Sequence, residues 1–160
     1  MIQTTAPISS IFIKEDILSE AELPRVREKV ASGMPWEKAV VEAAGCTEEK
    51  VLRTISENLH MEFLADLKGR SIPDVFLEKI PVEFARRFSI AAVEKNDVSM
   101  TVATALPMNY HLTDELSTIF GTEIETVIAP SDEIEHLIGK AYQARNTELD
   151  NVLEDVSGTN

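Results

Sequence analysis

The chain has 160 residues, of which 44% are hydrophobic and 27% are charged, and 28 acidic residues outnumber 15 Lys and Arg to give a net charge of −13. This composition is typical of one folded domain, and its acid excess disfavours general binding to nucleic acids or anionic membrane surfaces. The single cysteine, Cys46, excludes a disulfide framework, and no apolar run reaches the roughly 18 residues that span a bilayer. Residues 1–13 lack the basic start of a signal peptide. We therefore expect a cytoplasmic protein without direct membrane insertion.

The first 60 residues predict three short helices. Ser19 to Glu22 form a capping-box pattern, and Pro24 suits the first turn of the helix that follows. Pro35 opens the second helix, and Thr47 caps the third. Each helix has an apolar stripe at helical spacing: Val26 and Val30, then Trp36, Ala39, Val40 and Ala43, then Val51, Leu52, Ile55 and Leu59. Residues 1–60 are therefore expected to form a helical subdomain.

Residues 61–144 predict a mixture of strands and helices. Pro73 and Pro81 each open a short helix. Two β-like runs, 89–93 and 98–103, flank a polar turn and predict a hairpin. A capped helix, a strand over 123–128 with alternating polarity, and a final helix from Ser131 follow. The predicted fold class is α+β, with a three-helix N-terminal subdomain followed by a small, mainly antiparallel sheet packed with helices.

Beyond Tyr142 the sequence becomes polar. Residues 146–160 contain Glu148, Asp150, Glu154 and Asp155 and no Lys or Arg. Such a composition favours a solvated segment over a packed one. We expect residues 145–160 to form an acidic flexible tail or linker.

A search for catalytic motifs favours a non-enzymatic role. Gly139-Lys140-Ala141 lacks the upstream glycine and the hydroxyl of a phosphate loop, and neither a dinucleotide fingerprint nor a nucleophile elbow occurs. His60, His111 and His136 lie far apart without the spacing of metal ligands. We predict no catalytic residues, no cofactor and no metal. The alternative is a small enzyme whose site is assembled by the fold. For Cys46, a small buried side chain is expected in preference to a reactive thiolate.

Four side chains are candidates for a partner or ligand surface. Trp36 is the only tryptophan and follows Met34 on a short helix, and interface hot spots are rich in Trp. Arg86 and Arg87 form the densest basic spot of an acidic chain. The alternatives are core packing for Trp36 and pairing of the two arginines with the chain's own acids.

The order of motifs along the chain resembles a known family. The run from Ile80 to Phe88 (IPVEFARRF), the strand Met100 to Ala103, the segment from Leu112 to Ile124, Val127 to Pro130, and the helix from Ile134 to Tyr142 occur in the same order in that family. Together they resemble the N-terminal domain of general secretion pathway protein E and of type IV pilus assembly ATPases. The resemblance extends over about residues 19–142.

This resemblance implies a docking domain. Its relatives hold an ATPase motor to a cytoplasmic domain of an inner-membrane platform protein, so we expect that protein, and a motor ATPase, as partners, with peripheral attachment to the inner membrane through them. Some relatives bind cyclic di-GMP through two copies of a motif that begins Arg-Leu-Gly. Here Met34-Pro35-Trp36 stands at the second copy, without the Arg and the Gly, so a cyclic di-GMP sensor is the alternative function and not the expected one.

Overall fold

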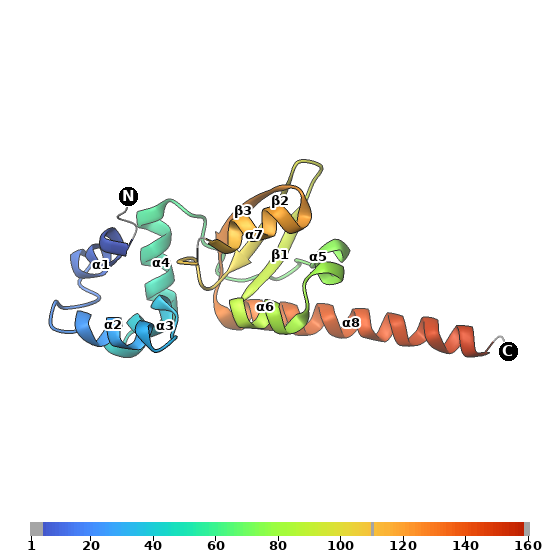
Figure 1. Cartoon of the computed structure of the whole chain (residues 1–160), viewed down its shortest axis with the longest axis horizontal. Coiled ribbons are helices and arrows are strands. Elements are labelled where there is room, and N and C mark those ends of the chain that lie inside the picture. The colour runs from blue at the N-terminus through green and yellow to red at the C-terminus, as the bar shows by residue number, and fades with distance from the viewer. Residues whose placement is uncertain (1–4, 110, 159–160) are drawn as a thin grey trace.

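The computed structural model describes residues 5–109 and 111–158 of the chain, so residues 1–4 of the N-terminal segment and the last two residues of the predicted tail lie outside the described residues. Within the described residues the chain forms eight helices and a three-stranded sheet (Figure 1). The predicted α+β class is confirmed. The helices are α1 (Thr5–Lys14), α2 (Leu23–Ala31), α3 (Trp36–Ala44), α4 (Glu48–Leu59), α5 (Asp74–Lys79), α6 (Val82–Phe88), α7 (His111–Phe120) and α8 (Ser131–Gly158), and the strands are β1 (Ile90–Lys95), β2 (Ser99–Thr104) and β3 (Glu123–Ile128).

The N-terminal part holds four helices, so the prediction of three was one short. The three predicted helices correspond to α2, α3 and α4, and α1 precedes them. Isoleucines in its sequence give a weak helix signal because β-branched side chains have low helix propensity. Tertiary packing stabilises α1 instead: it packs against α4, and Phe12 is fully buried.

Local signals in the sequence place the ends of the predicted helices. The Thr47 hydroxyl accepts a hydrogen bond of 3.2 Å from the backbone N–H of Lys50, as expected of a helix cap. Pro35 occupies the N-cap position of α3, and Gly45 ends that helix with a φ of +68°, a left-handed conformation that suits glycine. These caps fix the turn between α3 and α4.

One of the two strand pairings in the sheet is parallel, which corrects the prediction of a mainly antiparallel sheet. β1 pairs antiparallel with β2, as the hairpin required, but β2 pairs parallel with β3 in register from Ser99↔Glu123 to Thr104↔Ile128. The physical reason is the connection: α7 carries the chain back to the start of the sheet before β3 begins, and such a crossover makes two neighbouring strands parallel. The strands are short, and four of the six residues of β1 and five of the six residues of β2 are buried.

The end of β3 joins the sheet to the N-terminal helices. The chain after α4 runs beside it, where Ile128 donates to the Glu62 carbonyl and accepts from the Leu64 N–H. Phe63 forms an isolated parallel bridge with Ile128. The predicted boundary near residue 60 remains a prediction: α4 ends at Leu59, and the buried residues on its two sides form one cluster.

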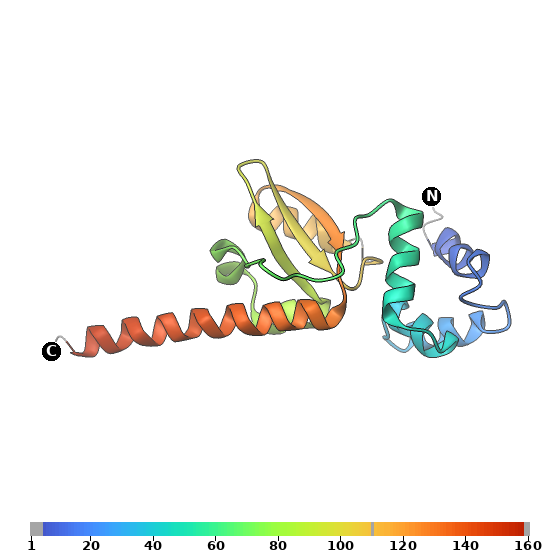
Figure 2. The ribbon, with the colours of Figure 1, turned by 180° about the vertical axis from the view of Figure 1, so that it is seen from behind.

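Helix α8 continues through the segment predicted to be a flexible tail, as far as Gly158. It leaves the sheet and extends away from the N-terminal helices (Figures 1 and 2). Its first half is anchored, since Ile134 and Ile138 are fully buried and the Tyr142 hydroxyl donates a 2.6 Å hydrogen bond to the Ile80 carbonyl. The second half has no internal proline or glycine before its end, so an already nucleated helix can propagate through it despite its polarity. None of the helices that the structure describes is long and apolar enough to cross a membrane.

The continuity of α8 gives the first prediction. Asn146→Pro removes a backbone donor where α8 leaves the folded body and should break the helix there. We expect far-UV circular dichroism to show a loss of helix with little change in melting temperature, because residues 146–152 are exposed. Asn146→Ala is the control and should keep the helical signal. An unchanged spectrum in the proline variant would mean that this segment is not helical in solution.

Candidate functional site

A cleft lies between the N-terminal helices and the sheet. It has a volume of about 480 Å³, within the range of sites that accept small ligands or anchoring side chains. One wall comes from the α2–α3 turn and the first turn of α3, and the other from the end of α6 and the loop after β2. We call it the Trp36 cleft; it is lined by Val30, Gly33, Met34, Pro35, Trp36, Glu37, Lys38, Arg87, Phe88, Leu106, Met108 and Asn109.

The Trp36 cleft brings together three of the four residues singled out in the sequence. Met34 and Trp36 contribute to one wall, both half-buried, and Arg87 contributes to the opposite wall. Arg86 does not line the cleft, because its guanidinium Nε donates to Glu135 of α8 at 2.8 Å. The two neighbouring arginines therefore have different surroundings: one faces the cleft and the other pairs with an acid of the chain itself.

The rim of the cleft is basic. Lys38 and Arg87 are exposed, and within the described part of the chain neither forms an ion pair. The guanidinium carbon of Arg87 lies 5.4 Å from the centre of the Phe88 ring, a distance at which the cation is attracted to the ring face. The rim therefore presents two cations without an ion-pair partner beside apolar walls.

The floor of the cleft holds a buried acid that the sequence reasoning missed. Glu37 is 3% exposed, and its Oε2 accepts a 2.8 Å hydrogen bond from the backbone N–H of Met108. Burial raises the pKa of this carboxyl from 4.5 to about 7, against the lowering effect of the hydrogen bonds, and the nearby charge of Glu48 adds to the rise. Glu37 thus ties the first turn of α3 to the loop after β2.

A signal for Glu37 was present in the sequence. Acids in the first turn of a helix are common because they suit the helix dipole. Glu37 lies in such a first turn, so its position alone does not single it out. It also precedes Val40 and Val41 by three and four residues, so it lies on an apolar stripe where an exposed acid is not expected. A charged residue on such a stripe is a candidate for burial with a partner.

The remaining candidate groups do not assemble into a catalytic site. His60, His111 and His136 are exposed on α4's end, α7 and α8. The half-buried Cys46 thiol has its pKa raised by burial, which favours the unreactive thiol. Across residues 5–109 and 111–158, no group of three or more His, Cys, Asp or Glu side chains is placed to hold a metal ion.

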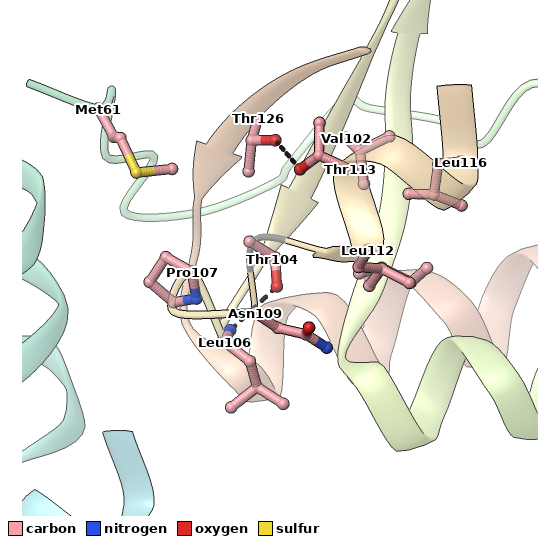
Figure 3. Close-up of a pocket in the computed structure, with 11 residues that line it drawn as sticks. Met61, Val102, Thr104, Leu106, Pro107, Asn109, Leu112, Thr113, Leu116 and Thr126 are labelled. Atoms are coloured by element: carbon pink, nitrogen blue, oxygen red, sulfur yellow. Dashed lines mark hydrogen bonds between the residues drawn. The ribbon is translucent and has the colours of Figure 1, made fainter. Parts of the chain in front are cut away.

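A second, smaller cavity lies between α7 and the sheet (Figure 3). Its volume of about 90 Å³ is room for only a few waters. Thr113 and Thr126 face one another across it with hydroxyl oxygens 3.4 Å apart, and the Thr104 hydroxyl accepts from the Leu106 N–H. Its polar groups satisfy one another, so it is a packing feature of the sheet more than a ligand site.

Comparison with known proteins places the chain in a family. The model of the MshEN domain matches residues 59–148, more than half of the chain. The chain belongs to the MshEN domain family. The matched region begins at the end of α4 and includes Arg87 and Met108, whereas Met34 and Trp36 precede it.

This MshEN domain is similar to part of a pilus assembly ATPase and to two solved structures. The chain is 23% identical over 150 residues to the type IV pilus assembly ATPase PilB of Myxococcus xanthus (strain DK1622), with 93% of this chain and 26% of that protein covered. The fold is that of the N-terminal domain of XpsE (TM-score 0.72, 20% identity, 89% of this chain and 98% of that one) and of MshE in a structure with cdg (TM-score 0.66, 18% identity, 84% and 98%). The chain spans about a quarter of the length of PilB.

The buried carboxyl gives a prediction for stability against pH. Because the pKa of Glu37 is raised to about 7 in the folded state, the folded protein binds more protons than the unfolded one between pH 4.5 and 7. The free energy of unfolding should therefore fall as pH rises through this window, by up to about 3 kcal/mol. Glu37→Gln keeps an oxygen acceptor for the Met108 N–H and removes the titration, so it should be more stable than the parent at pH 8 and about equally stable at pH 4.5.

Urea unfolding at several pH values measures this difference. Glu57→Gln, at an exposed position of α4 whose carboxylate forms no ion pair within the described residues, is the control and should follow the parent's pH profile. A Glu37→Gln variant that is less stable at every pH by a constant amount would show that the hydrogen bond, and not the ionisation, governs the role of Glu37.

Proposed function

We propose that this MshEN domain is a non-catalytic docking domain that binds a cytoplasmic domain of an inner-membrane platform protein through the Trp36 cleft. The observation that carries this proposal is the cleft itself: apolar walls with two unpaired cations at the rim. Membership of the MshEN family and similarity to N-terminal domains of secretion ATPases support the choice of machinery.

The walls of the cleft are suited to a protein anchor. Trp36, Met34 and Phe88 are half-buried, so each already has a defined position and still offers apolar surface. Side chains of this kind dominate binding energy when a partner excludes water from them. A small apolar segment of a partner would cover them at low entropic cost, because these three residues lie on helices or on the turn between two helices.

The rim chemistry specifies the partner further. Lys38 and Arg87 are available to an anionic group of the partner, because neither forms an ion pair within the described residues. The proposed occupant is therefore a segment in which an apolar or aromatic side chain lies next to an Asp or Glu. Opposite charges at the rim would steer and orient the encounter, while the apolar walls would supply most of the affinity.

The proposal places the domain beside a motor ATPase. PilB is named as a type IV pilus assembly ATPase, and the chain covers 26% of it. We propose that a motor of this kind is the second partner, that the domain itself performs no hydrolysis, and that it lies in the cytoplasm and reaches the inner membrane only through the platform protein.

A cyclic di-GMP sensor is the second candidate. It is supported by the likeness to MshE, whose structure was solved with cdg, and by an aromatic ring and a guanidinium in the same cleft. Against it stands Met34-Pro35-Trp36, which lacks the Arg and Gly with which the binding motif of the relatives begins. The docking function is therefore the main proposal.

Paired arginine variants test the docking proposal. Arg87→Glu should weaken binding to the cytoplasmic domain of the platform protein by roughly tenfold or more, because it places like charge at the rim facing an acidic partner. Arg86→Glu is the matched control: it lies one residue away and pairs with α8, so it should leave affinity almost unchanged. Isothermal titration of the two purified domains measures both.

Trp36→Ala tests the apolar wall. It should reduce affinity by a similar or larger factor, and thermal unfolding of the variant shows whether the fold is retained. Equal affinities of the parent, the Arg87→Glu variant and the Trp36→Ala variant for the platform protein would show that the docking surface lies outside the cleft. No binding by the parent domain would contradict the docking function itself.

Titration with cyclic di-GMP separates the two candidate functions. We expect no saturable heat at high micromolar ligand, because Met34-Pro35-Trp36 has neither the arginine nor the glycine with which the binding motif begins. Saturable binding that is lost in Arg87→Glu would instead make the cleft a nucleotide site.

A further inference from the structure

We propose that Glu37 controls the opening of the Trp36 cleft: when its carboxyl is protonated, α3 stays against the loop after β2, and when it is ionised, the two walls separate while the sheet remains folded. This inference goes beyond the proposed function, because the opening is a property of the domain alone and needs no partner. In the open state, water reaches both the Glu37 carboxyl and the Met108 N–H that binds it in the closed cleft.

The two walls of the cleft belong to parts of the molecule that pack mainly on themselves. In the part of the chain that the structure describes, α3 packs mainly on α2 and α4, whereas the sheet packs mainly on α6, α7 and α8 (Figure 1). Between these parts, two carboxylates of the described helices bind backbone N–H groups at the edge of the sheet: Glu37 binds Met108, and Glu48 binds Ser131. The walls can therefore separate without unpairing any strand.

Of these two carboxylates, Glu37 is the one that lines the cleft. It is 3% exposed, and its Oε2 lies 2.8 Å from the Met108 nitrogen. An ionised carboxylate at such a position has lost most of its hydration, and one hydrogen bond does not replace it. Separation of the walls would restore water to the carboxylate. Ionisation therefore favours the open state.

The charges around the buried carboxyl do not offset this effect. From α4, Glu48 carries a like charge that adds to the cost of ionisation. Lys38 on the same helix and Arg87 on α6 are exposed at the rim, where water screens them. On α2, Lys29 already pairs with Glu42 at 3.1 Å, and the loop after β2 carries no charged side chain. The closed cleft thus holds no cation bound to this acid.

The direction of the pH effect follows from the two states. Burial raises the pKa of Glu37 from 4.5 to about 7 in the closed cleft, whereas the hydrated carboxyl of the open state has its ordinary pKa. Between these two values the open state has lost a proton that the closed state keeps. The ratio of open to closed molecules should therefore increase through this pH window, by at most about 300-fold, and level off above it.

Hydrogen exchange of the Met108 amide measures this opening, because the same N–H donates to Glu37. After correction for the intrinsic exchange rate, its protection should fall between pH 4.5 and pH 8. The amide of Ala103, a fully buried residue of β2, is the internal reference. It should be more protected than Met108 at every pH and more sensitive to low urea, since its exchange requires the sheet to unfold.

Two variants assign the effect to one carboxyl. Glu37→Gln keeps an oxygen acceptor for the Met108 N–H and removes the titration, so the protection of Met108 should no longer change with pH. Glu57→Gln, at an exposed position of α4, is the control and should show the parent's pH profile.

Three results would overturn the proposal. The first is equal protection and equal urea sensitivity of the Met108 and Ala103 amides, which would mean that the cleft opens only when the whole domain unfolds. The second is a protection of Met108 that stays constant with pH in the parent. The third is a pH dependence that persists in Glu37→Gln, which would assign the opening to another group.

Discussion

The parallel pairing of β2 with β3 is the constraint on which the rest of the molecule depends. Because the two strands run in the same direction, the loops that follow them leave the same edge of the sheet. The loop after β2 carries Met108, whose N–H binds Glu37, and the turn after β3 carries Ser131, whose N–H binds Glu48. Both N-terminal helices that meet the sheet are therefore held at this edge, each by one carboxylate. An antiparallel third strand would place the turn after β3 at the far edge and remove the hydrogen bond from the Ser131 N–H to Glu48.

The two carboxylates are not equivalent. Glu48 is partly exposed and lies in the first turn of α4, where the helix dipole favours its charge. Glu37 is buried, and holding its charge there costs free energy that a neutral side chain would not cost. In return, the hydrogen bond from the Met108 N–H to Glu37 holds the two walls of the Trp36 cleft at a defined distance. The cleft thus keeps its shape through a group that weakens the fold above neutral pH, a trade that is common where binding needs a defined position.

The sequence predicted local features of the fold well and long-range ones poorly. The turn and cap residues Thr47, Pro73 and Pro81 placed helices because their signals are local. The prediction of a mainly antiparallel sheet was wrong about the pairing of β3, since no residue within β3 reports which strand it pairs with or in which direction. α1 and the outer half of α8 were missed for opposite reasons: one owes its helix to packing against α4, and the other extends a helix that nucleates far upstream. In the site, Met34, Trp36 and Arg87 could be singled out by residue type, but that they face one cleft follows only from the fold.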